Sequence, residues 1–253
     1  MNKKKNSFAE ELPHLDPPYN SRAWGHKFHS LCSYQGKLKP AIAHFLVKEF
    51  SKPGDLVLDP MGGVGTVAFE AALQGRRAVS NDISPLAHAV TAAKLSIFDA
   101  PTLLERIEQH RSHYSNFTPS SESIESVSFG LNGKIRDYYE PQTLNEIIYF
   151  RESFARSCLD KSDIWLRANL LHLLHGNRPY ALSRTSHPVT PMNPKGPFIY
   201  KNVFDHLRTR INALSKHPYP KEFIPGFAFE GPFETLQNRM VAKADTIITS
   251  PPF

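Results

Sequence analysis

Apolar positions three and four residues apart in KPAIAHFLVKEF predict a helix over 39–50, and Pro40 suits its first turn. SKPGD then breaks the pattern, and the apolar run LVLD at 56–59 predicts a short buried strand. After the string MGGVG, the helical period returns over 66–74 and ends at Gly75. The chain therefore begins its regular structure with helix, strand, glycine loop and helix.

A second strand and a second helix follow directly. RRAVSND at 76–82 predicts the strand, and PLAHAVTAAKL at 85–95 predicts the helix. The order strand, loop, helix, strand, helix is the beginning of a doubly wound sheet.

From about residue 101 the helical period dominates. Helices are predicted over 102–114, 141–159, 162–176 and near 202–215, with a loop rich in glycine and proline before the last one. Strand signals return only in FIPGFAFEG and ADTIITS, at 223–231 and 244–250. The later strands are thus separated from the first block by a mostly helical segment.

These patterns predict an α/β fold, namely a partial doubly wound, Rossmann-like sheet with a largely helical insertion. The expected parts are an N-terminal arm or loop at 1–38, a strand–helix block at 39–100, an insertion at 101–220 and returning strands at 221–253. The four expected strands end near Asp59, Asp82, Gly231 and Thr249.

Composition narrows the class of protein. The 253 residues carry a net charge of +6 and have a pI of about 9.2, which fits either a mildly basic protein or one that binds a polyanion such as nucleic acid. Cys32 and Cys158 lack zinc-ligand spacing, so no metal site and no disulfide framework are expected. We find neither a signal peptide nor an apolar run long enough to cross a membrane, and we expect a cytoplasmic protein.

The glycine loop is the first candidate site. A strand that ends in Asp59 leads into three glycines and then a helix, which lets a ligand approach the backbone closely. Asp82 ends the next strand, where a carboxylate can accept hydrogen bonds from ribose hydroxyls. Because no Lys-Ser or Lys-Thr follows the glycines, the loop is not a P-loop. The residues alone also allow a glycine turn with a structural aspartate.

The stretch from Lys37 to about Lys94 resembles the cofactor half of the S-adenosylmethionine-dependent DNA amino-methyltransferases. It has the Lys-Pro helix start, the DPxxGxGT loop and the acidic strand end of that family. The resemblance implies that 39–100 bind S-adenosylmethionine. The cofactor-binding residues that it implies are Lys39, Pro40, Asp59, Pro60, Gly62, Gly63, Gly65, Thr66, Asn81, Asp82 and Glu230.

Three of these positions have specific expected roles. Lys39 and Pro40 would lie near the methionine end of the cofactor. Pro232 stands where the family commonly has an aspartate near the adenine, so Glu230 is expected to take over that contact.

The string SPPF at 250–253 resembles the family's catalytic motif. An exocyclic amine on a base is a poor nucleophile because its lone pair is delocalised into the ring. The Ser250 hydroxyl and the Pro251 carbonyl can accept its two N–H bonds and direct the lone pair at a methyl donor. Pro252 fixes the backbone, and Phe253 can stack on a base that has left the duplex.

The first residue of this motif indicates the target base. In the family, serine goes mostly with cytosine N4, and aspartate or asparagine mostly with adenine N6. Ser250 therefore predicts a cytosine-N4 DNA methyltransferase of a modification system. Methylation at carbon 5 needs a nucleophilic cysteine, typically after a proline, and neither Cys32 nor Cys158 follows one.

Several alternatives stay open at this point. The activity could be adenine-N6 methylation of DNA or guanine-N2 methylation of RNA, since related motifs occur in both. The chain could also be an inactive remnant that binds cofactor or DNA. The strands expected after SPPF are absent, so we expect either a second polypeptide that supplies them or a truncated product.

Two other strings resemble functional motifs. DPPY at 16–19 matches the catalytic pattern, but no strand precedes it, and we interpret it as a proline turn. His172 and His175 lie near a predicted helix end without a third metal ligand, and we interpret them as packing residues.

The insertion occupies the place where this family often carries its target-recognition region. Its loop interleaves basic residues and His187 with Tyr180, Phe198 and Tyr200, a composition that suits duplex DNA. The expected DNA-binding residues are Arg178, Arg184, Lys195 and Lys201.

Overall fold

The computed structural model describes residues 10–21, 25–130, 133–156, 159–174, 179–185, 193–236 and 243–251. The chain forms two compact units. One unit comprises Met1–Phe98 and Lys216–Phe253, and the other comprises Asp99–Ser215.

The first unit contains a sheet and the helices that pack on it. Its longer helices and its strands are α2 (Pro40–Phe50), β1 (Leu56–Asp59), α3 (Thr66–Leu73), β2 (Arg77–Asp82), α4 (Pro85–Leu95), β3 (Phe227–Glu230) and β4 (Thr246–Ile247). Three short 3-10 helices complete it: η1 (Pro13–Leu15), η2 (Lys27–Ser30) and η4 (Phe233–Leu236).

The four strands form one parallel sheet in the order β3-β2-β1-β4. β1 pairs with β2 on one side and with β4 on the other, and β2 pairs with β3. The chain turns back across β1 when it enters β4, so the strand order reverses at this point. All carboxyl ends lie at one edge, where parallel α/β sheets bind ligands.

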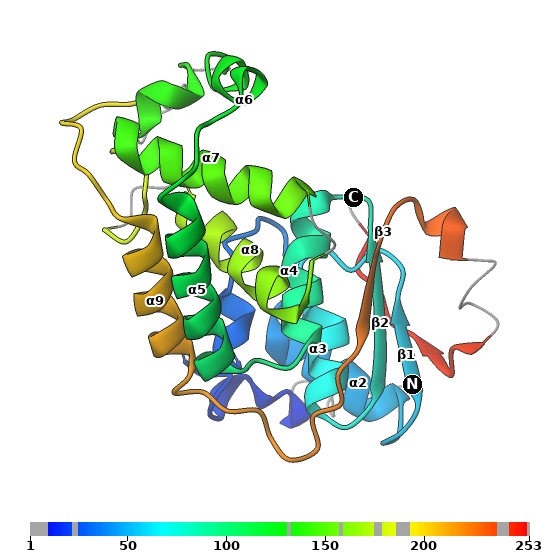
Figure 1. Ribbon diagram of the computed structural model, residues 1–253. Helices are drawn as coiled ribbons and strands as arrows, with labels where there is room; N and C mark the ends of the chain where they lie inside the picture. Colours follow the sequence, from blue (N-terminus) through cyan, green and yellow to red (C-terminus); the bar gives the residue numbers. More distant parts are fainter. Residues whose placement is uncertain are drawn as a thin grey trace. The chain divides into compact units, whose positions relative to one another are not determined.

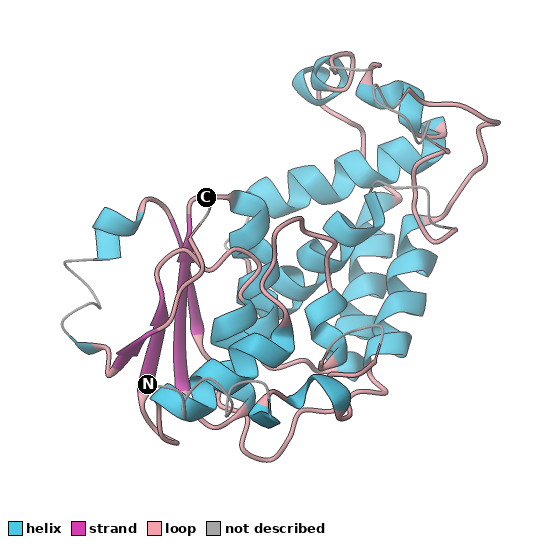
Figure 2. Cartoon of the chain, turned by 180° about the vertical axis from the view of Figure 1, so that it is seen from behind, coloured by secondary structure: helices cyan, strands magenta, loops and turns pink. Residues whose placement is uncertain are grey.

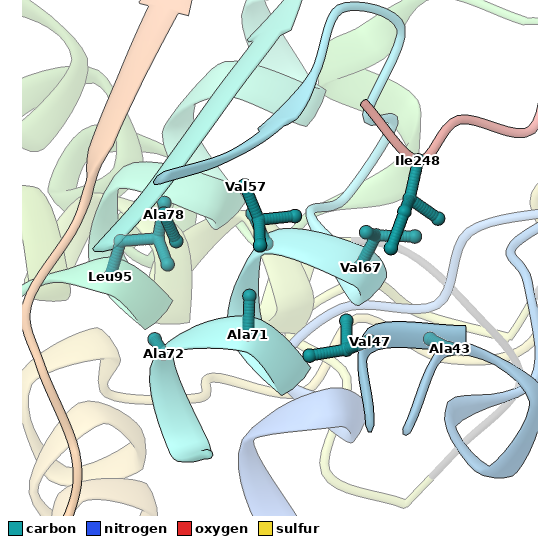
Figure 3. Packing of buried hydrophobic residues seen from close by; sticks show 10 residues of the cluster. Ala43, Val47, Val57, Val67, Ala71, Ala72, Ala78, Leu95 and Ile248 are labelled. Carbon is teal, nitrogen blue, oxygen red and sulfur yellow. The ribbon is translucent and has the colours of Figure 1, made fainter. Parts of the chain in front are cut away.

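Helices α2, α3 and α4 cover one face of the sheet (Figure 1). Figure 3 shows how Val57 and Ala78 of the strands meet Ala71 and Ala72 of α3. Because the inward positions of α3 are mostly alanine, the helix can approach the strands closely and leave no gaps. On the opposite face, Leu56, Leu58 and Val79 form a smaller buried cluster with Leu236.

The segment before α2, expected as an arm or loop, contains core residues. Among its described residues, Phe28 is fully buried and His29 is 2% exposed. The Phe28 ring lies against Phe98 and Tyr219, with ring centroids 5.4 and 5.2 Å away. The N-terminal segment is therefore part of the core, which its polar composition concealed.

A buried carboxylate fastens this segment to the helical layer. The Glu70 carboxylate, on α3, accepts hydrogen bonds from Tyr19 Oη at 2.8 Å and pairs with His29 Nε2 at 2.7 Å and His44 Nδ1 at 3.1 Å. Burial favours the neutral acid, but the hydrogen bonds from His29 and His44 outweigh it and lower the pKa of Glu70. Tyr19 belongs to the DPPY string, which forms a turn as predicted.

The second unit is helical. Its helices are α5 (Ala100–Tyr114), α6 (Ser121–Ser126), α7 (Pro141–Arg156), α8 (Lys161–Leu174) and α9 (Val203–Leu214), with the 3-10 helix η3 (Ile135–Tyr138). Figure 2 shows these as helices joined by long loops, whereas the strands belong to the other unit. Trp165, Phe150 and Phe204 are buried in its core.

A buried ion pair supports this core. Arg106 donates two hydrogen bonds to Asp163, at 2.9 and 2.6 Å, and His110 Nε2 lies 3.0 Å from the same carboxylate. Burial raises the pKa of Asp163, but the hydrogen bonds from His110 and Arg106 reverse this and bring it to about 2.

The expected fold class is confirmed: a parallel α/β sheet of the doubly wound type carries a helical insertion. The four strands lie where the hydrophobic runs predicted them.

The burial of the N-terminal segment leads to the first prediction. Phe28→Ala should lower the free energy of unfolding by about 3 to 5 kcal/mol, because it removes a fully buried ring and leaves a cavity. Leu15→Ala is the control, since Leu15 is 74% exposed and should change stability by less than about 0.5 kcal/mol. Urea unfolding measures both, and a loss below about 1 kcal/mol for Phe28→Ala would restore the interpretation as a loose arm.

Candidate functional site

One pocket opens at the carboxyl edge of the sheet, with a volume of about 850 Å³. It is lined by the loops that follow all four strands and by residues 34–38 of the N-terminal segment. Residues 34–38 and residues 250–251, which are far apart in the sequence, thus meet around one cavity.

The glycine turn forms the floor of this pocket. Gly63 and Gly65 have φ angles of +51° and +67°, which side chains other than glycine rarely adopt. A Cβ atom on Gly62 would lie 2.0 Å from Ser80 Oγ, so this position has no room for a side chain. The Gly65 amide closes the turn on the Gly62 carbonyl at 2.8 Å, and Thr91 Oγ1 donates to the Gly63 carbonyl at 3.1 Å.

The end of β2 holds the loops in place. The Asp82 carboxylate accepts hydrogen bonds from the amides of Gly63 and Ser84, both at 2.8 Å. The Asn81 side chain donates to the carbonyls of Pro60 at 3.2 Å and Gly231 at 2.9 Å. Since a carboxylate has about four acceptor positions, Asp82 can still receive a hydroxyl from a ligand in the pocket.

Asp59 is an unusual carboxylate because it lines the pocket while being only 3% exposed. Burial raises its pKa to about 6, although hydrogen bonds from the Thr249 side chain and the Met61 amide oppose the shift. The nearby negative charge of Asp82 adds to the rise. Asp59 is therefore expected to gain or lose its proton at a pH slightly below neutral.

Strand β4 brings the proline motif to the same pocket. Its pairing with β1 is extended by hydrogen bonds from the Asp245 amide to the Leu56 carbonyl at 3.0 Å and from the Ile248 amide to the Leu58 carbonyl at 3.1 Å. Ser250 and Pro251 follow the strand and line the pocket. Pro252 and Phe253 lie outside the described residues.

Most of the expected cofactor residues line the pocket: Asp59, Pro60, Gly62, Gly63, Thr66, Asn81 and Asp82. Gly65 shapes the turn without lining the cavity. Lys39 and Pro40 do not line the pocket: Lys39 is exposed and Pro40 is buried at the start of α2. Lys37 and Leu38, the two residues directly before Lys39, line it.

Glu230 does not line the pocket either. It lies within β3, level with Asp82, and its Oε2 is 3.2 Å from His88 Nδ1 without the alignment of a hydrogen bond. The residues beyond the strand end reach the pocket, among them Phe233 and Glu234. The rule that ligands bind beyond the carboxyl ends of strands would have favoured 231–234 over Glu230.

The charges around the pocket are uneven. Among the described lining residues, Asp59, Asp82 and Glu234 are acidic, and Lys37 is the one lysine or arginine. Lys37 Nζ donates to the His29 carbonyl at 3.0 Å, which leaves two N–H groups for other acceptors. Partial burial lowers the pKa of Lys37.

The four expected DNA-binding residues have different surroundings. Arg184 donates to the carbonyls of Lys195, Asp137 and Gly196, and Lys201 donates to those of Ala181 and Ser183. Lys195 is exposed. Arg178 lies outside the described residues, as do His175, His187 and Cys158.

Two further properties concern the described residues only. They contain no cluster of three or more histidine, cysteine, aspartate or glutamate side chains that could hold a metal ion. Across the described helices, none combines the length and apolar character needed to span a bilayer.

A parallel α/β sheet with a glycine turn after its first strand, an acidic residue after its second and a pocket at the reversal of strand order defines a nucleotide-type ligand site. Residues 21–93 match the family of N6/N4 methyltransferases described as DNA methylase. The predicted resemblance to the N4/N6 DNA methyltransferases is thereby confirmed for this part of the chain.

Two curated relatives agree with this match. The chain is 29% identical to the Type II methyltransferase M.MjaII of Methanocaldococcus jannaschii over 75 residues, which are 30% of this chain and 14% of the relative. It is 22% identical to the Type II methyltransferase M.BsoBI of Geobacillus stearothermophilus over 250 residues, which cover 89% of this chain and 49% of the relative. The chain thus spans at most about half the length of these relatives.

The chain is also similar to a solved structure. The rRNA methyltransferase aviRa from Streptomyces viridochromogenes aligns with 88% of this chain and 63% of its own, at 12% identity and a TM-score of 0.33.

The raised pKa of Asp59 generates the second prediction. Its pKa is 3.8 in an exposed state and about 6 in the fold, so the folded protein binds the proton more tightly. The resulting stabilisation is present below pH 4 and is lost as the pH rises through 6. At pH 8, Asp59→Asn should therefore raise the free energy of unfolding of the ligand-free protein by up to about 3 kcal/mol.

Urea unfolding at pH 3.5 and pH 8 tests this expectation. The difference between Asp59→Asn and the wild type should be small at the lower pH, which makes that measurement the internal control. Equal stabilities at both pH values would show that the buried carboxylate is ionised at no cost to folding.

Proposed function

We propose that the chain is an S-adenosylmethionine-dependent DNA methyltransferase that methylates the exocyclic N4 of cytosine. The observation that carries the proposal is that the glycine turn and Ser250-Pro251 line one pocket. The match of residues 21–93 to DNA methylases supports DNA as the substrate. Because both relatives are named Type II methyltransferases, a modification system is the proposed setting.

The pocket suits S-adenosylmethionine in shape. Its floor is backbone that carries no side chain at Gly62 and Gly63, so a large ligand can lie directly on it. Asp82 would accept ribose hydroxyls, and the exposed ring of Phe233 offers a flat apolar surface for the adenine. When bound, this cofactor supplies an electrophilic methyl group on a sulfonium.

The charges of the pocket suit the same ligand. S-adenosylmethionine has one carboxylate and two positive groups, and the described lining has one cation and three carboxyl groups. Lys37 is the proposed partner of the methionine carboxylate, and Asp59 attracts the positive groups when ionised. Complementary charges would therefore fix the direction in which the cofactor lies.

The proposed catalytic step depends on hydrogen-bond acceptors. Ser250 Oγ and the Pro251 carbonyl would each accept an N–H of the target amine, so that its lone pair is directed at the methyl group. The amine is inaccessible within a base pair, and the base must therefore leave the duplex first. The exposure of both residues leaves room for an incoming base.

Serine at position 250 favours cytosine over adenine as the target. The third prediction follows: with tritiated S-adenosylmethionine and unmethylated duplex DNA, the purified chain should produce label in N4-methylcytosine after digestion to nucleosides. Ser250→Ala should lower this rate by about 100-fold, in the range found when one transition-state hydrogen bond is removed. Its affinity for S-adenosylmethionine should change less than threefold.

Each other outcome has a distinct meaning. Label in N6-methyladenine would keep the family and reject the cytosine assignment. Label on carbon 5 of cytosine, or in RNA alone, would contradict the proposal, and an inactive chain that still binds cofactor would favour the remnant.

The fourth prediction concerns Lys37. Lys37→Met preserves side-chain length but removes the charge, and it should weaken S-adenosylmethionine binding by about 10- to 100-fold. Calorimetry with 5′-methylthioadenosine is the control, because this ligand lacks the carboxylate and should bind both proteins equally. If both ligands lost affinity equally, Lys37 would act on the pocket's shape rather than on the carboxylate.

A further inference from the structure

The second unit contains a long stretch without any acidic residue. From position 164 to 204 there is no aspartate or glutamate, whereas Arg167, Arg178, Arg184, Lys195 and Lys201 fall within it. Such a stretch carries positive charge that its own sequence does not neutralise.

Two of these cations fix the loop that carries them. The Arg184 guanidinium donates to the carbonyls of Lys195 and Gly196, and the Lys201 ammonium donates to the Ala181 and Ser183 carbonyls. Carbonyl oxygens are neutral, so these hydrogen bonds order the backbone while both positive charges remain. The Lys195 amide also donates a hydrogen bond to the Thr185 carbonyl at 2.8 Å, which joins these two parts of the loop.

The described part of this loop displays apolar side chains to solvent. Phe198 is 51% exposed and Ile199 is 60% exposed. The Arg184 guanidinium lies 4.3 Å from the centre of the Phe198 ring, and this cation–π contact covers one face of the ring. Rigid, exposed apolar groups beside cations suit a partner that has both anionic and apolar surface.

Helix η3 and the residue before it, Lys134, lie beside the loop. The Tyr138 carbonyl of η3 accepts a hydrogen bond from the Arg184 amide at 2.7 Å. A Cβ atom on Gly133 would lie 3.1 Å from Pro194, so the two segments are in contact there. Lys134 and Arg136, on either side of Ile135, are exposed.

Two neighbouring carboxylates, those of Glu140 and Glu146, accept hydrogen bonds from within this unit. Glu140 accepts the amides of Gln142 and Thr143 at the start of α7. Glu146 is 1% exposed and accepts from Tyr200 Oη at 2.6 Å and from the Val203 amide at 2.7 Å. Asp137 is half-buried and follows Arg136 directly, so its carboxylate offsets part of the positive charge there.

We propose that Lys134, Arg136, Lys195, Phe198 and Ile199 form a surface that binds duplex DNA, here named the basic loop surface. The three cations contact phosphates, and the two apolar side chains lie against the bases or sugars between the strands. This proposal deepens the proposed function, on which it rests for the choice of DNA. Arg184 and Lys201 are positioning residues, because most of their N–H groups already donate to backbone carbonyls.

Duplex DNA fits these observations better than a protein partner does. Phosphates accept hydrogen bonds from lysine and arginine at regular spacing, and apolar side chains pack on sugars, thymine methyls or base steps. The stretch from 164 to 204, which has no acidic residue, would repel a basic protein. An acidic protein lacks the regularly spaced negative charges that the phosphates of DNA offer. A protein partner is therefore the outcome that the experiment must be able to reveal.

The fifth prediction is tested by fluorescence anisotropy of the full chain with a labelled 30-base-pair duplex over a range of salt concentrations. The double variant Phe198→Ser with Ile199→Ser should weaken binding at least tenfold, and Lys195→Ala should reduce the slope of log affinity against log salt by about 1. Matched controls are Ile124→Ser, which alters another exposed isoleucine of this unit, and Lys161→Ala. Both should bind within twofold of the wild type.

Thermal unfolding and S-adenosylmethionine affinity separate binding effects from damage to the fold. Variants that bind DNA weakly but keep both properties support the basic loop surface. The proposal would be overturned if the double variant bound the duplex as tightly as the wild type, or if the controls lost as much affinity. It would also be overturned if the wild-type chain bound a protein partner but no duplex. If duplex binding depends on the loop while no methyl transfer occurs, the proposed function fails and the surface stands.

Discussion

Two adjacent polar residues at the end of β2, Asn81 and Asp82, make the hydrogen bonds on which the pocket depends. Asp82 fixes the glycine turn through the Gly63 amide, and Asn81 joins the loops after β1 and β3 through Pro60 and Gly231. Asn81 is 2% exposed, so its bonds are protected from competition with water. One strand end thereby sets the spacing of three loops, and any ligand must fit the space that they leave.

The same pocket carries an electrostatic cost. Burial of Asp59 raises its pKa, and the negative charge of the nearby Asp82 adds a smaller contribution. A ligand with positive groups removes part of this cost when it binds. The pocket is therefore better suited to a cationic ligand than to a phosphate, which agrees with the missing P-loop lysine.

The sequence predicted the parts of the fold that rest on local patterns. The glycine turn and the four strands were found because apolar runs, glycines and acidic strand ends are local signals. Lys37 was missed because it lies in irregular backbone, where no period shows which way a side chain points. Glu230 was expected to contact the adenine, whereas Glu234 lines the pocket, because the course of the loop after β3 cannot be read from a local pattern.

Long-range contacts were beyond the reach of such patterns. Phe28 and His29 lie in a polar stretch, and only their contacts with Phe69 and Glu70 show that the N-terminal segment is core. Likewise, a basic loop looks the same whether its cations are in solvent or bound to its own carbonyls. Arg184 is the clearest case, since its acceptors are up to 47 residues away along the chain.

These charges imply a division of work between the two units. The described lining of the pocket is net acidic, so it would repel a DNA phosphate rather than attract it. An enzyme that brings a base to such a pocket needs its phosphate-binding charge elsewhere, and the acid-free stretch from 164 to 204 lies in the other unit. In the proposed function, this separation would let Asp59 and Asp82 remain acidic for a cationic cofactor while the basic loop surface supplies affinity for the polyanion. A chain with both charges in one pocket would weaken each, because Lys and Asp side chains at short range would pair with one another before either met its ligand.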